Sequence, residues 1–396
     1  MIPCFLTLPG EGARTSGRII RKVRLLALRH LLTVNARELG DVAASMATLQ
    51  RVLAVAVKRD SKRVLAAVGS PDVLPWLLVS IEGFRPIEQC IRAAVPSLLA
   101  TLSTLPEAVL WDAEVAELSD GERFWTLSPP AKGVQVDPSG VTLRLADGAF
   151  AGLDDLPGAS HHLLLRGGVR LALRDRFPLA MVEDHPEKQG NAFDLGERPE
   201  REWVDALSAA LVLIEEGLPA WYSELPLTLS RLVPVGFEEK LHLSASYREA
   251  PGMAYLTLHP NPLTLAEAVI HETQHGKLNA LTWLDKVLIN GRSFWTTSPV
   301  RPDERPIMGV LLAVHAFVPV AALHCALAER DWPDAHFFLR RRREVLASNE
   351  RGLRVLEAHS QPTELGSRLL ADLRALHDHL VAASGDLIDV ASITSL

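Results

Sequence analysis

Two histidines spaced four residues apart, His271 and His275, are the side chains in this sequence whose spacing points most directly to chemistry. On a helix, positions i and i+4 lie on one face, so both imidazoles can reach the same metal ion. Glu272 is rotated by about 100° from His271 and can serve as an acid or base beside that ion. The H-E-x-x-H pattern therefore predicts a metal site. The alternative is two polar histidines and a solvated glutamate on a surface helix.

The residues around the motif predict the helix that positions it. Asn261 and Pro262 are expected to end the preceding segment, and Thr264 and Glu267 to form a capping box. Apolar residues at helical spacing then supply a packing face, namely Leu265, Ala268, Val269 and Leu278. We expect a helix over residues 265–281.

A catalytic metal needs a third protein ligand and an open position. The apolar segment 307–329 carries His315 in its middle, where a buried imidazole needs a polar partner. We predict His315 as the third ligand, and a core histidine bonded to backbone is the alternative. Pro319 lies four residues on and leaves the His315 carbonyl without its helical donor. Four further candidates are Asp303, Glu304, Asp285 and, on the opposite helix face, His324.

The loop before that segment holds Arg301 and Arg305 between prolines. Prolines restrict the backbone, and a guanidinium group binds a carboxylate through two parallel hydrogen bonds. Two arginines close to a metal suit an anionic cosubstrate such as a 2-oxo acid. A surface loop with ordinary ion pairs is the alternative.

Composition sets limits on the class of protein. With 396 residues the chain is long enough for two domains, and 48% hydrophobic residues predict a substantial core. The net charge of −7 argues against general nucleic-acid binding. Three widely spaced cysteines indicate a reducing compartment. With no apolar run of about 18 residues and no secretion signal at the start, we expect a cytoplasmic protein without a membrane partner.

In the first half of the chain, the pattern of apolar residues changes near residue 105. Helical periodicity marks residues 19–32, 42–57 and 87–102, and basic residues line the first of these segments. That basic face is expected to be solvated, with docking of an acidic partner as the alternative. Between 108 and 178 the runs are short and alternating, with a strand at 141–145 and a hairpin across Gly167-Gly168. The polar segment 181–198 is expected to be a long loop.

The second half predicts a helix at 202–216 and extended stretches at 227–235, 241–247 and 253–258. Residues 290–305 are expected to be a loop, and helices follow at 307–329, 334–347 and 348–380. The predicted fold class is α+β, helix-rich, with a zincin-like half in which the H-E-x-x-H helix lies beside a second long helix and a small antiparallel sheet. Residues 1–180 would form a helical and β-hairpin region for support or peptide docking, and residues 181–396 the metal-binding catalytic region.

Two coupled stretches carry a resemblance to a known family. The first is His271-Glu272-x-Gln274-His275-x-Lys277-Leu278. The second is Ser298-Pro299-x-Arg301-Pro302-Asp303-x-Arg305-Pro306, followed by Gly309-Val310-Leu311 and His315-Ala316-Phe317. In these stretches the chain resembles the H-E-x-x-H peptide-modification proteins found with ribosomally made peptide natural products. The resemblance covers residues 240–330 and departs from the family at Val300, where an aromatic residue is expected.

That resemblance implies a 2-oxoglutarate-dependent peptide β-hydroxylase that uses mononuclear Fe(II) and O₂ on a precursor peptide. It implies His271, His275 and His315 as metal ligands, with a carboxylate triad that uses Asp303 left open. Arg301 or Arg305 would hold the distal carboxylate of 2-oxoglutarate. Glu272 would orient a water molecule or a ligand.

Two other functions stay open at this point. A zinc peptidase would use Glu272 as general base and Tyr255 or His259 to polarise the carbonyl group. A non-catalytic protein would only dock a peptide. Imidazole ligands suit Fe(II) and zinc alike, so the motif does not choose the metal. The sequence allows a homodimer and does not predict one.

Overall fold

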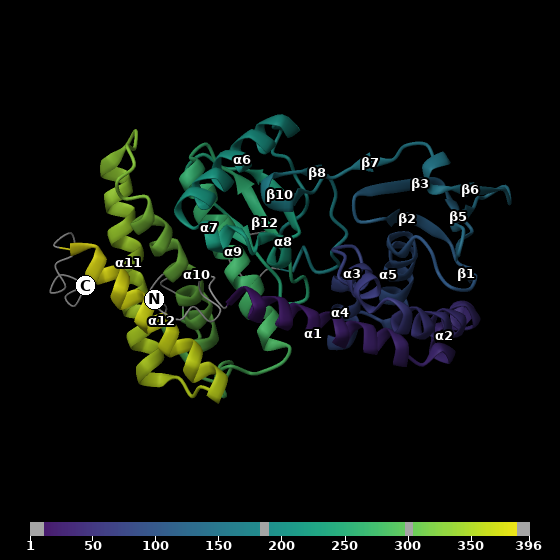
Figure 1. The fold of residues 1–396 in the computed structure, drawn as a ribbon, viewed down its shortest axis with the longest axis horizontal. Helices are drawn as coiled ribbons and strands as arrows, with labels where there is room; N and C mark the ends of the chain where they lie inside the picture. Colours follow the sequence, from purple (N-terminus) through teal and green to yellow (C-terminus); the bar gives the residue numbers. More distant parts are fainter. Residues whose placement is uncertain (1–11, 183–189, 298–303, 386–396) are drawn as a thin grey trace. The chain divides into compact units, whose positions relative to one another are not determined.

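The computed structural model describes residues 12–182, 190–297 and 304–385, and its fold is α+β, as predicted (Figure 1). The contacts within the chain divide it into two compact units. The first unit comprises Met1–Ile20, Leu165–Val169 and Asp194–Leu396, and contains the H-E-x-x-H motif. The second comprises Arg21–Leu164 and Arg170–Phe193.

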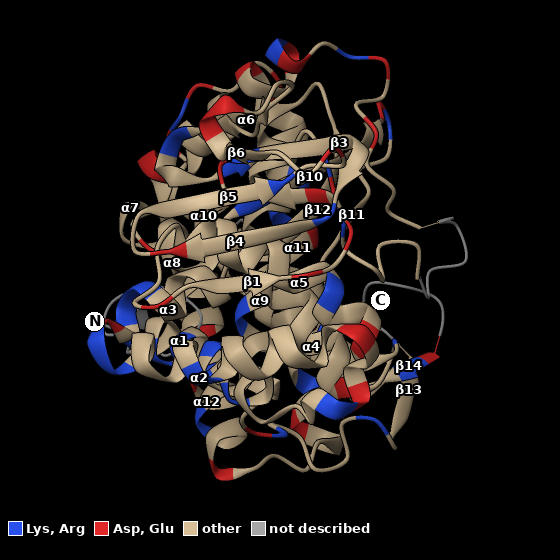
Figure 2. Cartoon of the chain, turned by 90° about the vertical axis from the view of Figure 1, so that its right-hand side faces the viewer, with Lys and Arg blue, Asp and Glu red and all other residues tan. Residues whose placement is uncertain are grey.

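The helices of the second unit follow the apolar periodicity of the sequence. They are α1 (Gly12–Thr33, from Arg21 on), the 3-10 helix η1 (Ala36–Val42), α2 (Ala43–Arg59), α3 (Ser61–Val68), α4 (Leu74–Glu82) and α5 (Ile87–Leu102). The three helices predicted here are confirmed. Lys and Arg lie along α1 (Figure 2), although Arg24 is partly buried over Gly69 instead of fully solvated.

Short antiparallel strands complete the second unit. One sheet has the order β1 (Val109–Trp111), β4 (Gly133–Asp137), β5 (Gly140–Arg144) and β6 (Phe150–Gly152). Another has the order β2 (Val115–Ser119), β3 (Arg123–Ala131) and β7 (Ser160–His161). The predicted hairpin across Gly167-Gly168 is confirmed, because β8 (Leu163–Leu164) pairs antiparallel with β9 (Arg170–Leu171). The 3-10 helix η2 (Leu153–Asp155) lies between β6 and β7, and η3 (Arg166–Gly168), which belongs to the first unit, lies between β8 and β9.

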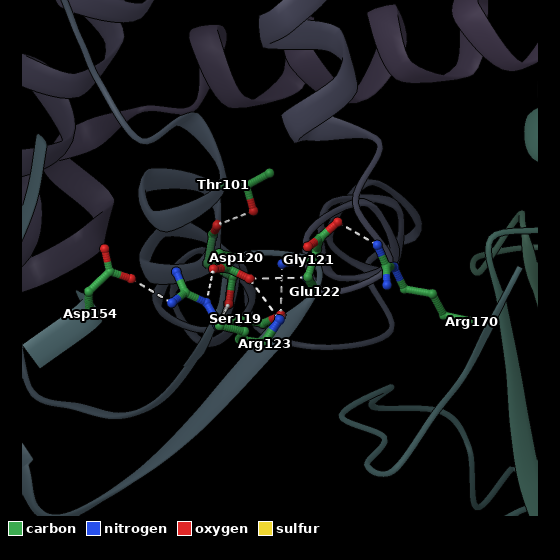
Figure 3. Close-up of polar contacts among 9 residues, drawn as sticks. Thr101, Ser119, Asp120, Gly121, Glu122, Arg123, Asp154 and Arg170 are labelled. Atoms are coloured by element: carbon green, nitrogen blue, oxygen red, sulfur yellow. Dashed lines mark hydrogen bonds and ion pairs between the residues drawn. The ribbon is translucent and has the colours of Figure 1, made fainter. Parts of the chain in front are cut away.

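The turn between β2 and β3 is held by a polar network (Figure 3). The Asp120 carboxylate accepts hydrogen bonds from the backbone N–H groups of Glu122 and Arg123, at 3.0 and 2.7 Å. The Arg123 side chain bonds Asp120 at 2.8 Å and Asp154 at 2.6 Å, and Arg170 pairs with Glu122. These contacts hold the turn between β2 and β3 in place.

The first unit consists of helices and a small mixed sheet. Strand β12 (Met253–Leu258) runs parallel to β10 (Arg231–Phe237) and antiparallel to β11 (Ser244–Ala245). All six residues of β12 are buried. The helices are α6 (Glu200–Gly217), α7 (Pro219–Tyr222), α8 (Leu225–Thr228), α9 (Pro262–Thr282), α10 (Ile307–Ala326), α11 (Ala335–His359) and α12 (Glu364–Ala383). The chain enters α9, which carries the motif, directly from the buried strand β12 (Figure 1).

The start of α9 differs from the prediction. The helix begins at Pro262, and the side chain of Asn261 accepts a hydrogen bond from the Leu263 N–H at 2.9 Å. The predicted capping box of Thr264 and Glu267 is therefore wrong. Proline fits the first helical position because its φ is preset and its missing N–H would have no helical partner there. Asparagine is a strong N-cap, so the dipeptide that follows the end of β12 also starts the helix.

Three other boundaries also differ from expectation. Helix α11 continues through residue 348 to His359, and the break predicted at 347/348 lies instead at 360–363, where Thr363 caps α12 by accepting from the Gly366 N–H at 3.1 Å. The predicted loop 290–305 contains β13 (Trp295–Thr297) paired antiparallel with β14 (Glu304–Pro306). The stretch predicted to be extended from 227 begins with the end of α8.

Two segments are long and apolar enough to span a membrane by length and composition, contrary to the expectation from the sequence. In Ile307–Ala326 the mean hydropathy is 2.0 and 72% of the window is buried. That helix, α10, packs against α9, α11 and α12, so its apolar surface is core. The other segment, Ala36–Arg59, has a mean hydropathy of 1.2 with 33% buried.

Candidate metal centre

His271 and His275 lie side by side on successive turns of α9, as the spacing predicts. Their Nε2 atoms are 2.7 Å apart, and the two rings meet edge to face with centroids 4.2 Å apart. With Glu272 they form a group whose ligand atoms all lie within 4.8 Å of one another. These three residues could hold a metal ion.

The geometry of this group fits a divalent transition metal. Two nitrogen ligands of a tetrahedral ion, each at 2.0–2.1 Å, lie roughly 3.3 Å apart. The two imidazoles therefore need to separate by only about half an ångström to bind one ion. Glu272 is 3% exposed, and its Oε2 atom is buried without a hydrogen bond to any described residue, which a nearby cation would offset. Imidazole and carboxylate suit both zinc and Fe(II), so the group does not choose between them.

The site is open to solvent on one side. His271 and His275 are partly exposed, whereas Glu272 and most other residues in the middle of α9 are buried. The ring of Phe317 on α10, also partly exposed, packs against His271 with centroids 4.6 Å apart.

Gln274 ties α9 to two other helices. Its Nε2 atom donates to the backbone carbonyl of His315 at 3.4 Å, and its Oε1 atom accepts from the Trp221 indole N–H at 3.1 Å. The His315 carbonyl is the group that Pro319 was predicted to leave without a helical donor. Gln274 therefore supplies the hydrogen-bond donor that α10 lacks at His315. The same contacts fix the rotation of α9, the helix that carries the histidines.

A buried ion pair holds the next turn of α9. The Lys277 ammonium group lies 2.5 Å from the Glu224 carboxylate, and each side chain is 2% exposed. Burial lowers the pKa of Lys277, and the charge of Glu224 opposes that shift. Gln274 and Lys277, two of the residues that carry the family resemblance, thus orient the helix and lie on its buried side.

His315 does not join the group of His271, Glu272 and His275. Its side chain is fully buried on α10, two residues before Phe317. Phe317, which packs against His271, follows His315 by two residues, or roughly 200° of helix rotation. In the part of the chain that the structure describes, no further His, Cys, Asp or Glu enters the group. Its role as the third ligand stays a prediction.

The other candidate ligands have different surroundings. His324 bonds Glu267 at 2.8 Å, and the Asp285 carboxylate accepts from Thr363 Oγ1 at 2.7 Å. Glu304 is exposed on β14. Asp303 and Arg301 lie outside the described residues.

Arg305 lies at the N-terminal end of α10. A Cβ atom built on Gly309 would be 3.2 Å from its Cδ, so the Arg305 stem runs over the first turn of that helix. Gly309 precedes Phe317 by eight residues, which corresponds to roughly 12 Å of helix. Contact between Arg305 and a cosubstrate stays a prediction.

The two predicted carbonyl-polarising residues lie near the β12 strand. Tyr255 is fully buried and meets Tyr247 edge to face at 5.3 Å. His259 lines a cavity of about 440 Å³ together with Phe237 and Leu258, and its Nδ1 accepts from the Asn261 N–H at 3.0 Å. Neither belongs to the group of three.

Sequence reasoning missed a charged cluster beside the motif, formed by Glu267, His324 and Arg341. Arg341 on α11 donates to both carboxylate oxygens of Glu267, with Nε 3.2 Å from Oε1 and 2.9 Å from Oε2, and Nη2 2.6 Å from Oε2. Burial alone would raise the pKa of Glu267, but the hydrogen bond from His324 and the charge of Arg341 hold it below its ordinary value. Glu267 lies four residues before His271, so the sequence could have predicted that both side chains lie on the same face of the helix.

No protein-family model matches the chain, and no curated protein matches it at a significant level. The assignment of the candidate metal centre therefore rests on the geometry of His271, Glu272 and His275.

Proposed function

We propose that the chain is a non-haem iron oxygenase, a 2-oxoglutarate-dependent peptide β-hydroxylase that acts on a ribosomally synthesised precursor peptide. The observation that carries a metal-dependent function is the pair of Nε2 atoms of His271 and His275, 2.7 Å apart on the open side of α9. The choice of an oxygenase rests on the resemblance in residues 265–281 and 298–317. A peptide substrate rests on the same resemblance.

In this proposal His271 and His275 hold the iron, and His315 or Asp303 completes the ligand set. Bound iron would supply the chemistry by which O₂ is reduced with 2-oxoglutarate as electron donor. One oxygen atom enters the C–H bond of the peptide to give an alcohol, and the other ends in succinate with release of CO₂. Three protein ligands at most leave room for the cosubstrate and O₂.

Other side chains would position reactants. Arg301 or Arg305 would hold the distal carboxylate of 2-oxoglutarate through a bidentate contact. Glu272, buried behind the two histidines, would accept a hydrogen bond from a water molecule or ligand and keep it oriented. Phe317 would limit the access of water from its side of His271.

A zinc peptidase is the second candidate, and Glu272 favours it. A buried carboxylate within 4.8 Å of two histidine nitrogens has the position that a general base toward an attacking water molecule needs. The same chain would then cleave peptides, with Tyr255 or His259 as the predicted donor to the carbonyl group. A protein that only docks a peptide would do neither.

Product analysis separates these functions. The purified protein would be loaded anaerobically with Fe(II) or with zinc and incubated with a peptide library, with and without 2-oxoglutarate and O₂. We expect succinate formation and peptides heavier by one oxygen atom only with Fe(II), 2-oxoglutarate and O₂ together. Cleaved peptides from the zinc form, without 2-oxoglutarate, would instead establish the peptidase.

The arginine assignment has its own test, product formation against 2-oxoglutarate concentration for Arg301→Met and Arg305→Met. Loss of a charge-assisted bidentate contact is expected to raise the 2-oxoglutarate requirement of one variant by roughly 30- to 1000-fold. Lysine should rescue only partly, because it offers a point charge in place of a planar fork. Unchanged saturation curves in both variants would remove these arginines from the site.

A further inference from the structure

A third arginine, Arg341 on α11, lies beside the metal group in the structure. Its guanidinium carbon is 5.9 Å from the centre of the Phe317 ring, and that ring centre is 4.6 Å from the centre of the His271 ring. The guanidinium carbon is therefore no farther from His271 than the sum of these two separations. Arg305, by contrast, lies over the first turn of α10.

The guanidinium group of Arg341 is held on one side and open on the other. Its Nε and Nη2 atoms bind Glu267, and Glu267 also bonds His324 at 2.8 Å. The remaining nitrogen, Nη1, has Glu344 as an ion-pair partner at 3.9 Å, beyond hydrogen-bond distance. The side chain is 32% exposed, so solvent reaches it. Its position is thus fixed before any ligand binds, which reduces the entropy lost on binding.

We propose that Arg341 anchors the distal carboxylate of a 2-oxo dicarboxylate whose other end binds at the metal group, with Glu267 as the residue that positions the guanidinium. The assignment rests on the proposed function and is an alternative, from outside the motif, to Arg301 or Arg305 as the arginine that holds this carboxylate. If it is right, Arg301→Met and Arg305→Met keep the wild-type affinity for 2-oxoglutarate. The partly exposed ring of Phe317 contacts His271 on one side and Arg341 on the other. It offers an apolar surface to the methylene groups that join the two acidic groups of such a ligand. A ligand without the distal carboxylate would lose only the contact with Arg341.

Calorimetric binding to the protein loaded with Co(II), a metal that stays in one oxidation state during the titration, tests this assignment without turnover. The two ligands are 2-oxoglutarate and 2-oxobutanoate, which keeps the 2-oxo acid group and lacks the second carboxylate. Arg341→Met should weaken 2-oxoglutarate binding by about 10- to 100-fold and leave 2-oxobutanoate binding unchanged. Arg340→Met is the matched control, because Arg340 is the neighbour on α11, is 61% exposed and pairs with Glu344. It should bind both acids like the wild type.

Two further variants separate this role from a contribution to folding. Arg341→Met leaves Glu267 buried without its cation, so the double variant Arg341→Met/Glu267→Gln removes both charges. Arg341→Lys keeps a cation beside Glu267 and loses the fork, and it should weaken 2-oxoglutarate binding by an intermediate factor. Circular dichroism and metal content would show that the variants compared are folded and loaded.

The outcomes distinguish the two proposals. If the wild type binds 2-oxoglutarate and the folded Arg341 variants bind it equally well, the role of Arg341 is refuted and the oxygenase proposal stands. An equal loss for both acids would refute the carboxylate contact and leave Arg341 a structural residue. Wild-type protein that takes up metal and binds neither acid would refute the oxygenase proposal, and the role of Arg341 with it.

Discussion

The side-chain amide of Gln274 on α9 donates a hydrogen bond to the backbone carbonyl of His315 on α10, at 3.4 Å. Pro319 has no N–H to give that carbonyl, so a residue of the motif helix supplies the missing donor. The same amide accepts from Trp221 at 3.1 Å. One side chain therefore connects three helices and sets the face that α9 presents.

Replacement of Gln274 by leucine should destabilise the first unit. The variant leaves the Trp221 indole N–H and the His315 carbonyl buried without this partner, which costs about 1–3 kcal/mol for such a group. Urea unfolding followed by tryptophan fluorescence measures the change. Asn279→Ala, at a partly exposed position on the same helix, is the control and should change stability little. Equal midpoints for Gln274→Leu and the wild type would show that the bridge contributes nothing.

His271→Ala and His275→Ala should each abolish metal binding and leave the fold intact. Loss of one ligand of a small set removes much of the affinity of the site, whereas the packing of α9 rests mainly on its buried residues and less on the two partly exposed imidazoles. Metal content after dialysis and circular dichroism are the two measurements. Full metal content in both variants would refute the site, and global unfolding on metal loss would identify a structural ion instead.

His315→Ala and Asp303→Asn test the third ligand. If His315 is a ligand, its replacement lowers metal stoichiometry sharply and Asp303→Asn matters less. His315 is buried and lies outside the group of His271, Glu272 and His275, so as a ligand it would have to move closer to that group. Metal loss in Asp303→Asn alone would establish the carboxylate triad.

Local patterns predicted much of the site, because its parts lie close together in sequence. The spacing of His271 and His275 was sufficient to predict a shared helix face, and the structure confirms it. The start of α9 was predicted wrongly because two residues that favour the N-cap position, Asn261 and Thr264, lie three residues apart. Only one of them can cap the helix, and in the structure it is Asn261. Local propensity does not decide between two strong caps.

Contacts between distant residues could not be predicted. Arg341 binds Glu267 across 74 residues of sequence, and nothing local in the run of arginines 340–343 selects one of them. The amphipathic pattern of α11 likewise did not show that the helix continues through Ser348, because serine is tolerated within a helix when the surrounding packing favours it. Such choices depend on tertiary packing.

The buried pair of Lys277 and Glu224 gives a stability prediction. Lys277→Met should destabilise by about 3–5 kcal/mol, because Glu224 stays buried without its cation. The double variant Lys277→Met/Glu224→Gln removes both charges and should recover much of that loss. Unfolding free energies of the two single variants and the double variant form the cycle. Additive effects, with no recovery in the double variant, would refute the coupling.

The stability of the second unit should fall as the pH drops below neutrality, and His30 should cause part of the fall. Its Nε2 atom lies 3.0 Å from the Ser80 hydroxyl, and burial lowers the pKa of His30 from its ordinary 6.5. Below that value the unfolded chain takes up a proton that the folded chain does not, so the free energy of unfolding decreases with falling pH. The decrease continues until the folded-state pKa is reached. Above the ordinary value both states are neutral at His30 and no dependence remains.

His30→Gln tests this origin, because glutamine can keep a hydrogen bond to Ser80 and does not titrate. Thermal unfolding midpoints at about pH 7.5 and about pH 5.5 should differ less in His30→Gln than in the wild type. His161→Gln, at an exposed position on β7 of the same unit, is the control and should keep the wild-type difference. His377 also has a pKa lowered by burial, so some dependence should persist from the first unit. An unchanged difference in His30→Gln would show that another group is responsible.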